Sequence, residues 1–441
     1  MDIKSIGKNI TTLRKSNSYT QESLAEKLNL SPQAISKWET GAGLPEASVL
    51  IILADLFGVT IDKILRPHTP GNTVTNFISR NTAVPENKTL DNIPRISRWN
   101  APEGCDMPYS FPATIATALC HIDAQEQGRA PITYPEINER FRDIMHITGM
   151  AYGFLWNIVS RHIIEELWHV NDIAEMVERV MGYYGRDYLW LTPENCTIGE
   201  IRHLIKWSIT QGRPLVMEWP GGIPEFNLVT GYADNADTLI GYTYCEECAT
   251  KTNEQGMFVN PARWGETWGN TQFRALVIGN KKAPNITDRD TVAYTLTVLN
   301  KSTADDKEFF LTHEYIAGDA ALQGWLAACD TDENTISLFR HDNIFNYFLY
   351  KNSAYAQNCI VTYYKKLAER SSRKVHDAVV QITLAIGKIT GEGEAATKAT
   401  SDKDANIAET AALCRRYIEN FIKHREYLRG WLREILDALE E

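Results

Sequence analysis

The chain has 441 residues, 44% of them hydrophobic, and a formal net charge of −11. This length predicts two to four domains of about 100–200 residues each, and the composition excludes a disordered tail or a fibrous repeat. No apolar run approaches the ~18 residues of a membrane span and the N-terminus lacks the pattern of a signal peptide, so we expect a cytoplasmic protein.

The first seventy residues alternate short amphipathic stretches with polar breaks, which is typical of a compact helical domain. Thr20 has the position of an N-cap for a second helix, and Ser31 followed by Pro32 has that of an N-cap for a third. Apolar residues at helical spacing indicate two more helices after Pro45. The sequence therefore predicts an all-α domain of five helices over residues 1–68.

The string TQESLAEKLNLSPQAISKWETG, which starts at Thr20, resembles the helix-turn-helix of the Cro and phage-repressor (XRE) family. The resemblance extends over about residues 3–65. That family places the N-terminal side chains of its third helix against base edges in the major groove of DNA. On this resemblance the base-contacting side chains are Gln33, Ser36 and Lys37. A glutamine amide can pair with adenine, and a lysine can donate to guanine or to phosphate.

The resemblance also implies supporting roles around this helix. Gln21 matches a glutamine that braces the phosphate and the first recognition glutamine, and Arg14 is expected to brace the domain. Ser31 and Thr40 can donate to phosphate, although Ser31 could equally be a helix cap alone and Gln33 a solvated side chain. The full set of predicted DNA-interface residues is Arg14, Gln21, Ser31, Gln33, Ser36, Lys37 and Thr40.

Charge is distributed unevenly along the chain. Residues 1–70 carry eight Lys or Arg and seven Asp or Glu, so this part has a net charge of +1 and the remainder a net charge of −12. A nearly neutral module neutralises few phosphates and binds DNA weakly. Two modules on two half-sites would compensate, so we expect a homodimer on a palindromic operator in double-stranded DNA.

A polar stretch rich in Pro, Asn and Thr, residues 69–100, has the composition of a linker. Beyond it, helical and strand patterns mix over residues 101–285, which predicts an α+β domain. The expected helices are residues 112–122, which we expect to be amphipathic, and 134–145, and the expected strands are 215–219, 226–232, 238–244 and 275–278.

The strings YSFPATIATALCHI (109–122), HITGMAYGFLWN (146–157) and GRPLVMEWPGGIPEFNLVTGYADNADTLIGYTY (212–244) resemble the butirosin biosynthesis protein H family, a branch of the papain-like peptidase and acyltransferase fold. That fold uses a cysteine at the start of a buried helix and a histidine on a facing strand. Here Ser110 opens the helix, and Glu225 and Asn227 stand where the histidine is expected. The resemblance therefore implies a papain-like domain without catalytic residues, a pseudo-enzyme.

A pocket that binds without catalysis is the natural role for such a domain, and an aromatic-lined cleft suits a small molecule or a peptide. The predicted ligand-binding residues are Ser110, Tyr152, Trp156, Trp219, Glu225 and Asn227. Each of the aromatic residues could instead be part of the core. The alternative function is a cysteine acyltransferase or peptidase-like enzyme fused to its own DNA-binding domain, with Cys105 or Cys120 beside a histidine.

One cysteine pair has the spacing of a metal or redox motif, Cys245 and Cys248. A structural zinc site needs four ligands, and no second pair follows, so two unrelated thiols are the simpler interpretation. The sequence predicts neither a metal nor a cofactor.

Residues 286–441 are predicted as a C-terminal α-helical region for ligand sensing or dimerisation, similar to the helical tail of the butirosin-H family. The expected helices are residues 317–328, 343–368, 374–389 and 406–439, with a mobile loop, GEGEAATKATSDKDA, before the last. The last helix could pack within the chain or against a second subunit. Together these patterns predict a multidomain, effector-controlled transcriptional regulator, with repression as the expected direction and no membrane contact.

Overall fold

The computed structural model describes residues 3–16, 19–57, 61–65, 84–96, 107, 109–129, 131–153, 155–157, 172–192, 195–196, 198–218, 226–242, 258–260, 274–300, 315–328, 356–402 and 406–440. The chain divides into two compact units, Met1–Arg80 and Asn81–Glu441, which confirms that it is multidomain. In the part that the structure describes, no helix combines the length and apolar character needed to cross a membrane.

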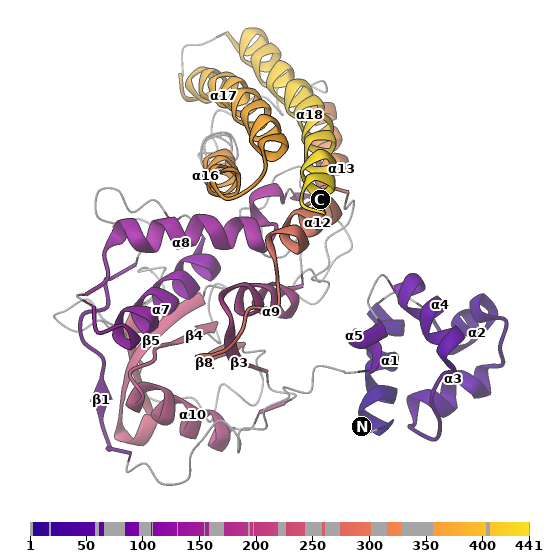
Figure 1. Cartoon of the computed structure of the whole chain (residues 1–441), viewed down its shortest axis with the longest axis vertical. Coiled ribbons are helices and arrows are strands. Elements are labelled where there is room, and N and C mark those ends of the chain that lie inside the picture. Colours follow the sequence, from indigo (N-terminus) through magenta and orange to yellow (C-terminus); the bar gives the residue numbers. More distant parts are fainter. Residues whose placement is uncertain are drawn as a thin grey trace. The chain divides into compact units, whose positions relative to one another are not determined.

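The described residues of unit 1 form five helices, as the sequence predicts (Figure 1). They are α1 (Ile3–Ser16), α2 (Gln21–Leu28), α3 (Pro32–Glu39), α4 (Ala47–Phe57) and α5 (Ile61–Leu65). Side chains from all five meet in one apolar core, in which Ile10, Leu24, Ile35, Leu53 and Ile64 are fully buried. The core fixes α2 and α3 relative to the other helices, because each contributes its buried stripe to the same cluster.

Unit 2 is built on an antiparallel sheet with the strand order β3-β8-β4-β5-β6-β7, and β1 pairs with β5 (Figure 1). The strands are β1 (Lys88–Thr89), β3 (Arg186–Leu191), β4 (Leu215–Glu218), β5 (Phe226–Ala233), β6 (Thr238–Tyr242), β7 (Phe258–Asn260) and β8 (Ala275–Lys281). β1 lies inside the expected linker, and Leu90, Ile93 and Ile96 after it are buried. Residues 84–96 therefore belong to unit 2 and not to a linker.

The helices that the structure describes in this part of unit 2 are α7 (Ser110–Glu126), α8 (Tyr134–Ile147), α9 (Ile173–Tyr184), α10 (Ile198–Thr210) and α12 (Asp288–Leu299). α7, α9 and α10 pack against the sheet, and α12 packs against α8. The ring of Phe111 on α7 meets the ring of Phe226 on β5 edge-on, with 5.1 Å between centroids. The expectation of an amphipathic helix over 112–122 is wrong, because α7 is buried from Ser110 to Ile122. It is covered by the sheet and by α8.

The four expected strands are confirmed, and with the helices they make the predicted α+β architecture. β3 was not expected. Its first residue, Arg186, is only 1% exposed and donates to Asp123 and Glu126 on α7. A buried arginine inside a strand is accommodated by these two carboxylates, which the local sequence does not indicate.

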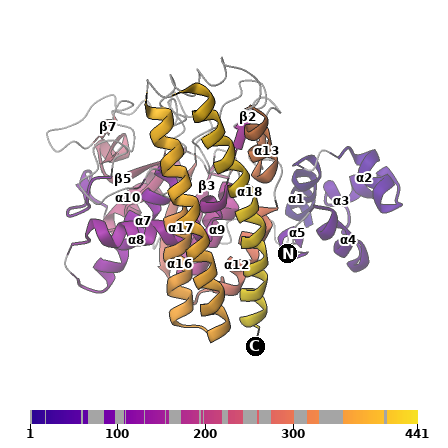
Figure 2. The ribbon, with the colours of Figure 1, turned by 90° about the horizontal axis from the view of Figure 1, so that it is seen from above.

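The C-terminal helices are α13 (Gly318–Ala328), α16 (Ala356–Glu369), α17 (Arg373–Ser401) and α18 (Ile407–Ala438), and a two-stranded sheet of β2 (Leu155–Asn157) and β9 (Tyr315–Ala317) accompanies them. Residues 343–355 of one expected helix lie outside the described residues. Figure 2 shows α16, α17 and α18 running beside one another. The last helix packs within the chain, since Tyr417 and Phe421 join a core with Trp325 of α13.

The prediction of a loop between the last two helices is wrong over residues 391–401. α17 continues through this stretch to Ser401. Alanine is the strongest helix former, and the three alanines Ala395, Ala396 and Ala399 offset the low hydrophobicity of this stretch. Ile389, Ala396 and Thr400 are also buried, so the helix has an inward face along its whole length.

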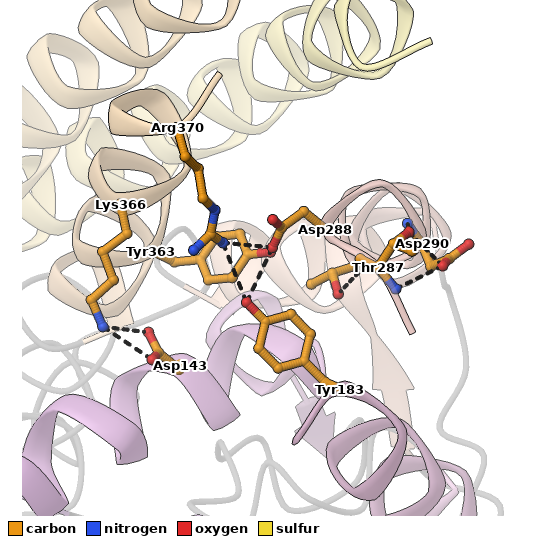
Figure 3. Close-up of polar contacts among 9 residues, drawn as sticks. Asp143, Tyr183, Thr287, Asp288, Asp290, Tyr363, Lys366 and Arg370 are labelled. Carbon is orange, nitrogen blue, oxygen red and sulfur yellow. Dashed lines mark hydrogen bonds and ion pairs between the residues drawn. The ribbon is translucent and has the colours of Figure 1, made fainter. Parts of the chain in front are cut away.

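Polar contacts join α16 to α8, α9 and α12 (Figure 3). Asp288 Oδ1 accepts hydrogen bonds from Tyr183 Oη at 3.1 Å, from Tyr363 Oη at 2.7 Å and from Arg370 Nη2 at 2.8 Å. Lys366 Nζ donates to both carboxylate oxygens of Asp143 at 3.0 Å. The α+β part and the helical region, which the sequence separates at residue 285, are thus parts of one compact unit.

Candidate nucleic-acid interface

The turn between α2 and α3 is fixed by local capping. Thr20 and Ser23 form a capping box, in which Thr20 Oγ1 accepts from the Ser23 N–H at 3.1 Å and Ser23 Oγ accepts from the Thr20 N–H at 2.8 Å. α2 ends at Asn29, which adopts the left-handed conformation with φ of 55°. Ser31 then caps α3 and Pro32 occupies its first turn, where no N–H is needed. The sequence alone predicts both caps.

α3 has one buried and one exposed face. Ile35 and Trp38 point into the core, whereas Gln33 and Lys37 are exposed and Ser36 is half-buried. The spacing of 33, 36 and 37 places these three side chains on one side of the helix. Three polar groups capable of base or phosphate contacts therefore share the outward face of a short, capped helix.

A buried ion pair holds the end of α3. Arg14 of α1 donates to Glu39 through Nε at 2.5 Å and through Nη2 at 3.1 Å, and its Nη1 donates to the carbonyl of Tyr19 at 2.7 Å. Gln21 Nε2 donates to Glu39 at 2.6 Å. We call these residues, Arg14, Gln21 and Glu39, the brace, because they join α1, α2 and α3.

Ionisation is coupled within the brace. Burial opposes the charge on Glu39, but the hydrogen bonds from Arg14 and Gln21 outweigh it and hold the pKa of Glu39 below its usual value. The hydrogen bond to Glu39 likewise raises the pKa of Arg14. Both groups are charged at neutral pH, and bidentate geometry fixes their relative orientation.

The predicted positioning residues differ in how their polar groups are used. Arg14 and Gln21 lie in the brace, so Arg14 has the geometry of the bracing role expected for it. Ser31 Oγ accepts from the Ala34 N–H at 3.3 Å, which leaves its hydroxyl hydrogen able to donate. Thr40 Oγ1 instead donates to the carbonyl of Ser36 at 2.8 Å, so it would have to rotate to reach phosphate.

Glu39 is a member of the brace that the local sequence does not predict. A carboxylate at the C-terminus of a helix is unfavourable, because the carbonyl end of the helix dipole is negative. An acidic residue in that position, beside a buried tryptophan, signals a cationic partner elsewhere in the fold. Arg14, 25 residues away, is that partner.

Comparison with known proteins concerns unit 1. A helix-turn-helix family model matches residues 10–64. Over 53 residues the chain is 49% identical to the HTH-type transcriptional activator BcrR of Enterococcus faecalis, a match that covers 12% of this chain and 26% of the length of BcrR. Over 67 residues it is 31% identical to the uncharacterized HTH-type transcriptional regulator YazB of Bacillus subtilis (strain 168), covering 15% of this chain and 97% of YazB.

This chain belongs to the helix-turn-helix family of transcriptional regulators. The resemblance inferred from the string that starts at Thr20 is thereby confirmed for the N-terminal unit. The matches lie within the first part of this helix-turn-helix regulator, and the chain spans about a quarter of the length of BcrR.

Two of the predicted ligand-binding residues of this regulator, Ser110 and Asn227, are buried in unit 2. Ser110 is the first residue of α7, is fully buried, and its Oγ accepts the N–H of Phe226 at 3.1 Å. Asn227, the next residue of β5, is 3% exposed and pairs with Met217 of β4. The hydroxyl of Ser110 therefore ties the start of α7 to the start of β5.

Tyr152 belongs to a different cluster. Its hydroxyl contacts His146 Nδ1 at 2.7 Å, and the His146 ring stacks on Tyr363 of α16 with 3.8 Å between centroids. Burial lowers the pKa of His146 well below its usual value, so the ring is neutral. Tyr152 is thus buried beneath α16. Trp156 lies on β2 opposite Ile316, and Trp219 and Glu225 lie outside the described residues.

Cys120 is poorly suited to nucleophilic catalysis in this regulator. Its thiol is buried inside α7 and donates to the carbonyl of Glu136 at 3.7 Å. Burial raises the pKa of Cys120 to about 11, so the thiol stays protonated at neutral pH. Cys105, Cys245 and Cys248 lie outside the described residues. Within the described ranges no three His, Cys, Asp or Glu side chains gather as a metal site would require.

Proposed function

We propose that this chain is a sequence-specific transcriptional regulator that binds a palindromic operator as a homodimer, with α3 of each copy in the major groove. The observation that carries the proposal is the outward face of α3, with exposed Gln33 and Lys37 and half-buried Ser36, on a helix that the buried brace holds in place. A rigid helix lowers the entropy lost on binding, because the contact groups are already oriented.

Each side chain on this face has a distinct role in the proposed complex. Gln33 pairs with adenine, Lys37 donates to guanine or phosphate, and the hydroxyl of Ser31 donates to phosphate. A bidentate base contact contributes about 1–3 kcal/mol of discrimination against the wrong base. With a net charge of only +1 over residues 1–70, one copy has little nonspecific affinity, and this favours two copies on two half-sites.

Unit 2 is proposed to be the sensor, a papain-like scaffold without catalytic residues that binds a small molecule or a peptide. The support is Ser110 at the start of a buried helix, in the place where that fold carries a cysteine, with its hydroxyl engaged by the N–H of Phe226. An effector controls DNA binding when it binds one arrangement of the dimer more tightly than another. Repression is the proposed direction.

The DNA-binding proposal is tested by fluorescence anisotropy of the full chain on DNA from its own upstream region and on random DNA. Gln33→Ala is expected to lower specific affinity about 5- to 150-fold, which corresponds to ~1–3 kcal/mol, and to leave affinity for random DNA unchanged. Lys37→Ala is expected to weaken both. The control is Lys27→Ala, which removes an exposed lysine of α2. It should lower the affinity for upstream DNA and for random DNA by the same factor. Unchanged specificity in Gln33→Ala would contradict the proposal.

The sensor proposal is tested by a thermal-shift screen of metabolites and short peptides on the full chain, followed by anisotropy with each hit. A ligand at 100 times its dissociation constant stabilises the folded state by about 2.7 kcal/mol. A hit must also change operator affinity. Deleting the gene should raise expression from its own promoter in a reporter strain, and lowered expression would contradict repression.

A further inference from the structure

One long face of α17 is exposed and partly apolar. Leu384 is 65% exposed and Val380 is 40% exposed, and Gly387 and Gly391 follow on the same side of the helix. The spacing 380, 384, 387 and 391 is the 4-3-4 pattern of a seam between two packed helices. The opposite face of α17 packs against α16 and α18 (Figure 2). The seam therefore points away from those two helices.

In the part of one copy that the structure describes, no contact accounts for the two glycines. Neither adopts a positive φ, and a Cβ added at Gly387 or Gly391 would meet no atom within 4 Å. Glycine inside a helix destabilises it by about 1 kcal/mol relative to alanine. Glycines on a helix surface allow another backbone to approach closely, so their position indicates a second helix that packs on this face.

The charges along the seam indicate which helix that is. If a second α17 runs antiparallel with a two-fold axis beside Gly387, Leu384 lies opposite Gly391 of the other copy and Asp377 lies opposite Lys398. Asp377 and Lys398 are both exposed. In the same register Val380 faces Ala395 and Gly387 faces Lys388, so a larger side chain meets a smaller one in each of these pairs. A parallel arrangement would place Asp377 against its own copy, which is repulsive.

We propose that α17 is the homodimerisation surface of this regulator, through an isologous, antiparallel pairing of two α17 helices. The surface is self-complementary in shape and in charge, as a two-fold interface requires. The proposed function assumes a homodimer, and this proposal names its interface. It rests on the proposed function only for the consequence that dimerisation pairs two DNA-binding units.

The test is the mass of the full-length chain in solution, measured by light scattering after size exclusion and by sedimentation velocity. The wild-type chain is expected to be a dimer at micromolar concentration, and Leu384→Gln is expected to raise the dimer dissociation constant at least tenfold. The matched control is Tyr427→Gln, a residue of α18 that is 64% exposed and lies outside the seam. It should stay dimeric. Circular dichroism confirms that both variants fold.

Charge reversal tests the antiparallel register. Asp377→Lys and Lys398→Asp are each expected to weaken the dimer, and the double variant is expected to restore it. Asp377 also lies 4.0 Å from Arg373 of its own helix, and a loss caused by that contact would not be rescued at residue 398. Gly391→Ala should raise the thermal midpoint of the monomer and weaken the dimer, because the added methyl group fills the space for Leu384 of the partner copy.

Three results would overturn the α17 interface. They are a monomeric wild-type chain, a Leu384→Gln variant that dimerises as tightly as the wild type, and a double charge reversal that does not restore the dimer. These outcomes are distinct from failure of the proposed function. That failure would be shown by unchanged DNA specificity in the Gln33→Ala variant.

Discussion

The two units of this chain each use a buried carboxylate to join helices, with opposite electrostatic results. In unit 1, Glu39 accepts from Arg14 and Gln21, and the pKa of Glu39 is lowered although burial opposes its charge. In unit 2, Asp143 accepts from Lys366, and the pKa of Asp143 is raised because burial outweighs that ion pair (Figure 3). Glu139, which also contacts Lys366, adds repulsion.

The difference lies in the number and geometry of the donors. A guanidinium presents two parallel N–H groups to a carboxylate, and Gln21 adds a third donor, so Glu39 is well compensated for its lost hydration. The single ammonium of Lys366 is shared between two carboxylates. We therefore expect the brace to stabilise unit 1 more than the Lys366 to Asp143 contact stabilises unit 2.

The largest effect is expected from Glu39→Gln. This change leaves the Arg14 guanidinium buried without its anion, and it should lower the opening free energy of unit 1 by about 3 kcal/mol. Hydrogen exchange of unit 1 peptides in the full chain measures this energy, and operator affinity should fall with it. Glu26→Gln, on the exposed side of α2, is the control. Equal exchange in both variants would show that the brace is not a stabilising element.

A smaller effect is expected from Gly7→Ala, which tests how closely α1 approaches the brace. A Cβ at Gly7 would lie 2.3 Å from the carbonyl oxygen of Trp38 and 2.8 Å from that of Glu39. The end of α3 would have to move, at a cost of about 1–3 kcal/mol. Gly43→Ala meets no atom within 4 Å and should be neutral in the same exchange experiment. A neutral Gly7→Ala would mean that α1 and α3 separate easily.

The smallest effect is expected from Asp143→Asn. Because the folded-state pKa of Asp143 is raised, its charged form costs stability at neutral pH, and this cost disappears as the pH falls through that pKa. The variant should therefore unfold within about 1 kcal/mol of the wild type at pH 7. Glu39 has the opposite dependence. Its contribution is present above pH ~4.3 and is lost as the pH falls through its lowered pKa.

Hydrogen exchange at a series of pH values, measured separately for peptides of each unit, checks both pH dependences. Unit 1 should keep the contribution of Glu39 until the pH falls to its lowered pKa, while unit 2 should gain stability relative to Asp143→Asn as the pH falls through the raised pKa of Asp143. A strongly destabilised Asp143→Asn variant at pH 7 would contradict the comparison.

Local signals in the sequence predicted unit 1 well. Thr20, Ser31 and Pro32 are capping residues within one turn of the helix ends that they define, so the boundaries of α2 and α3 follow from the chain itself. Glu39 was missed because its partner Arg14 is distant in sequence. Every predicted base-contacting side chain is on the outward face of α3.

Unit 2 was less predictable because its features depend on tertiary partners. β3 is stabilised by the contacts of Arg186 with α7, and residues 391–401 are helical because they pack on α18 and are rich in alanine. Tyr152 was predicted as a pocket residue because it is aromatic. It lies in a buried cluster with His146 and Tyr363. Aromatic residues line pockets and fill cores alike, and only the three-dimensional contacts distinguish the two.

The most direct test of the account is the sequence preference of the full chain, determined by selecting bound duplexes from a random library and sequencing them. The account predicts that the wild-type chain selects a palindrome with two half-sites about one helical turn apart, and that Gln33→Ala loses the preference at one base pair in each half-site. Selection of no motif, or of the same motif by both proteins, would contradict it.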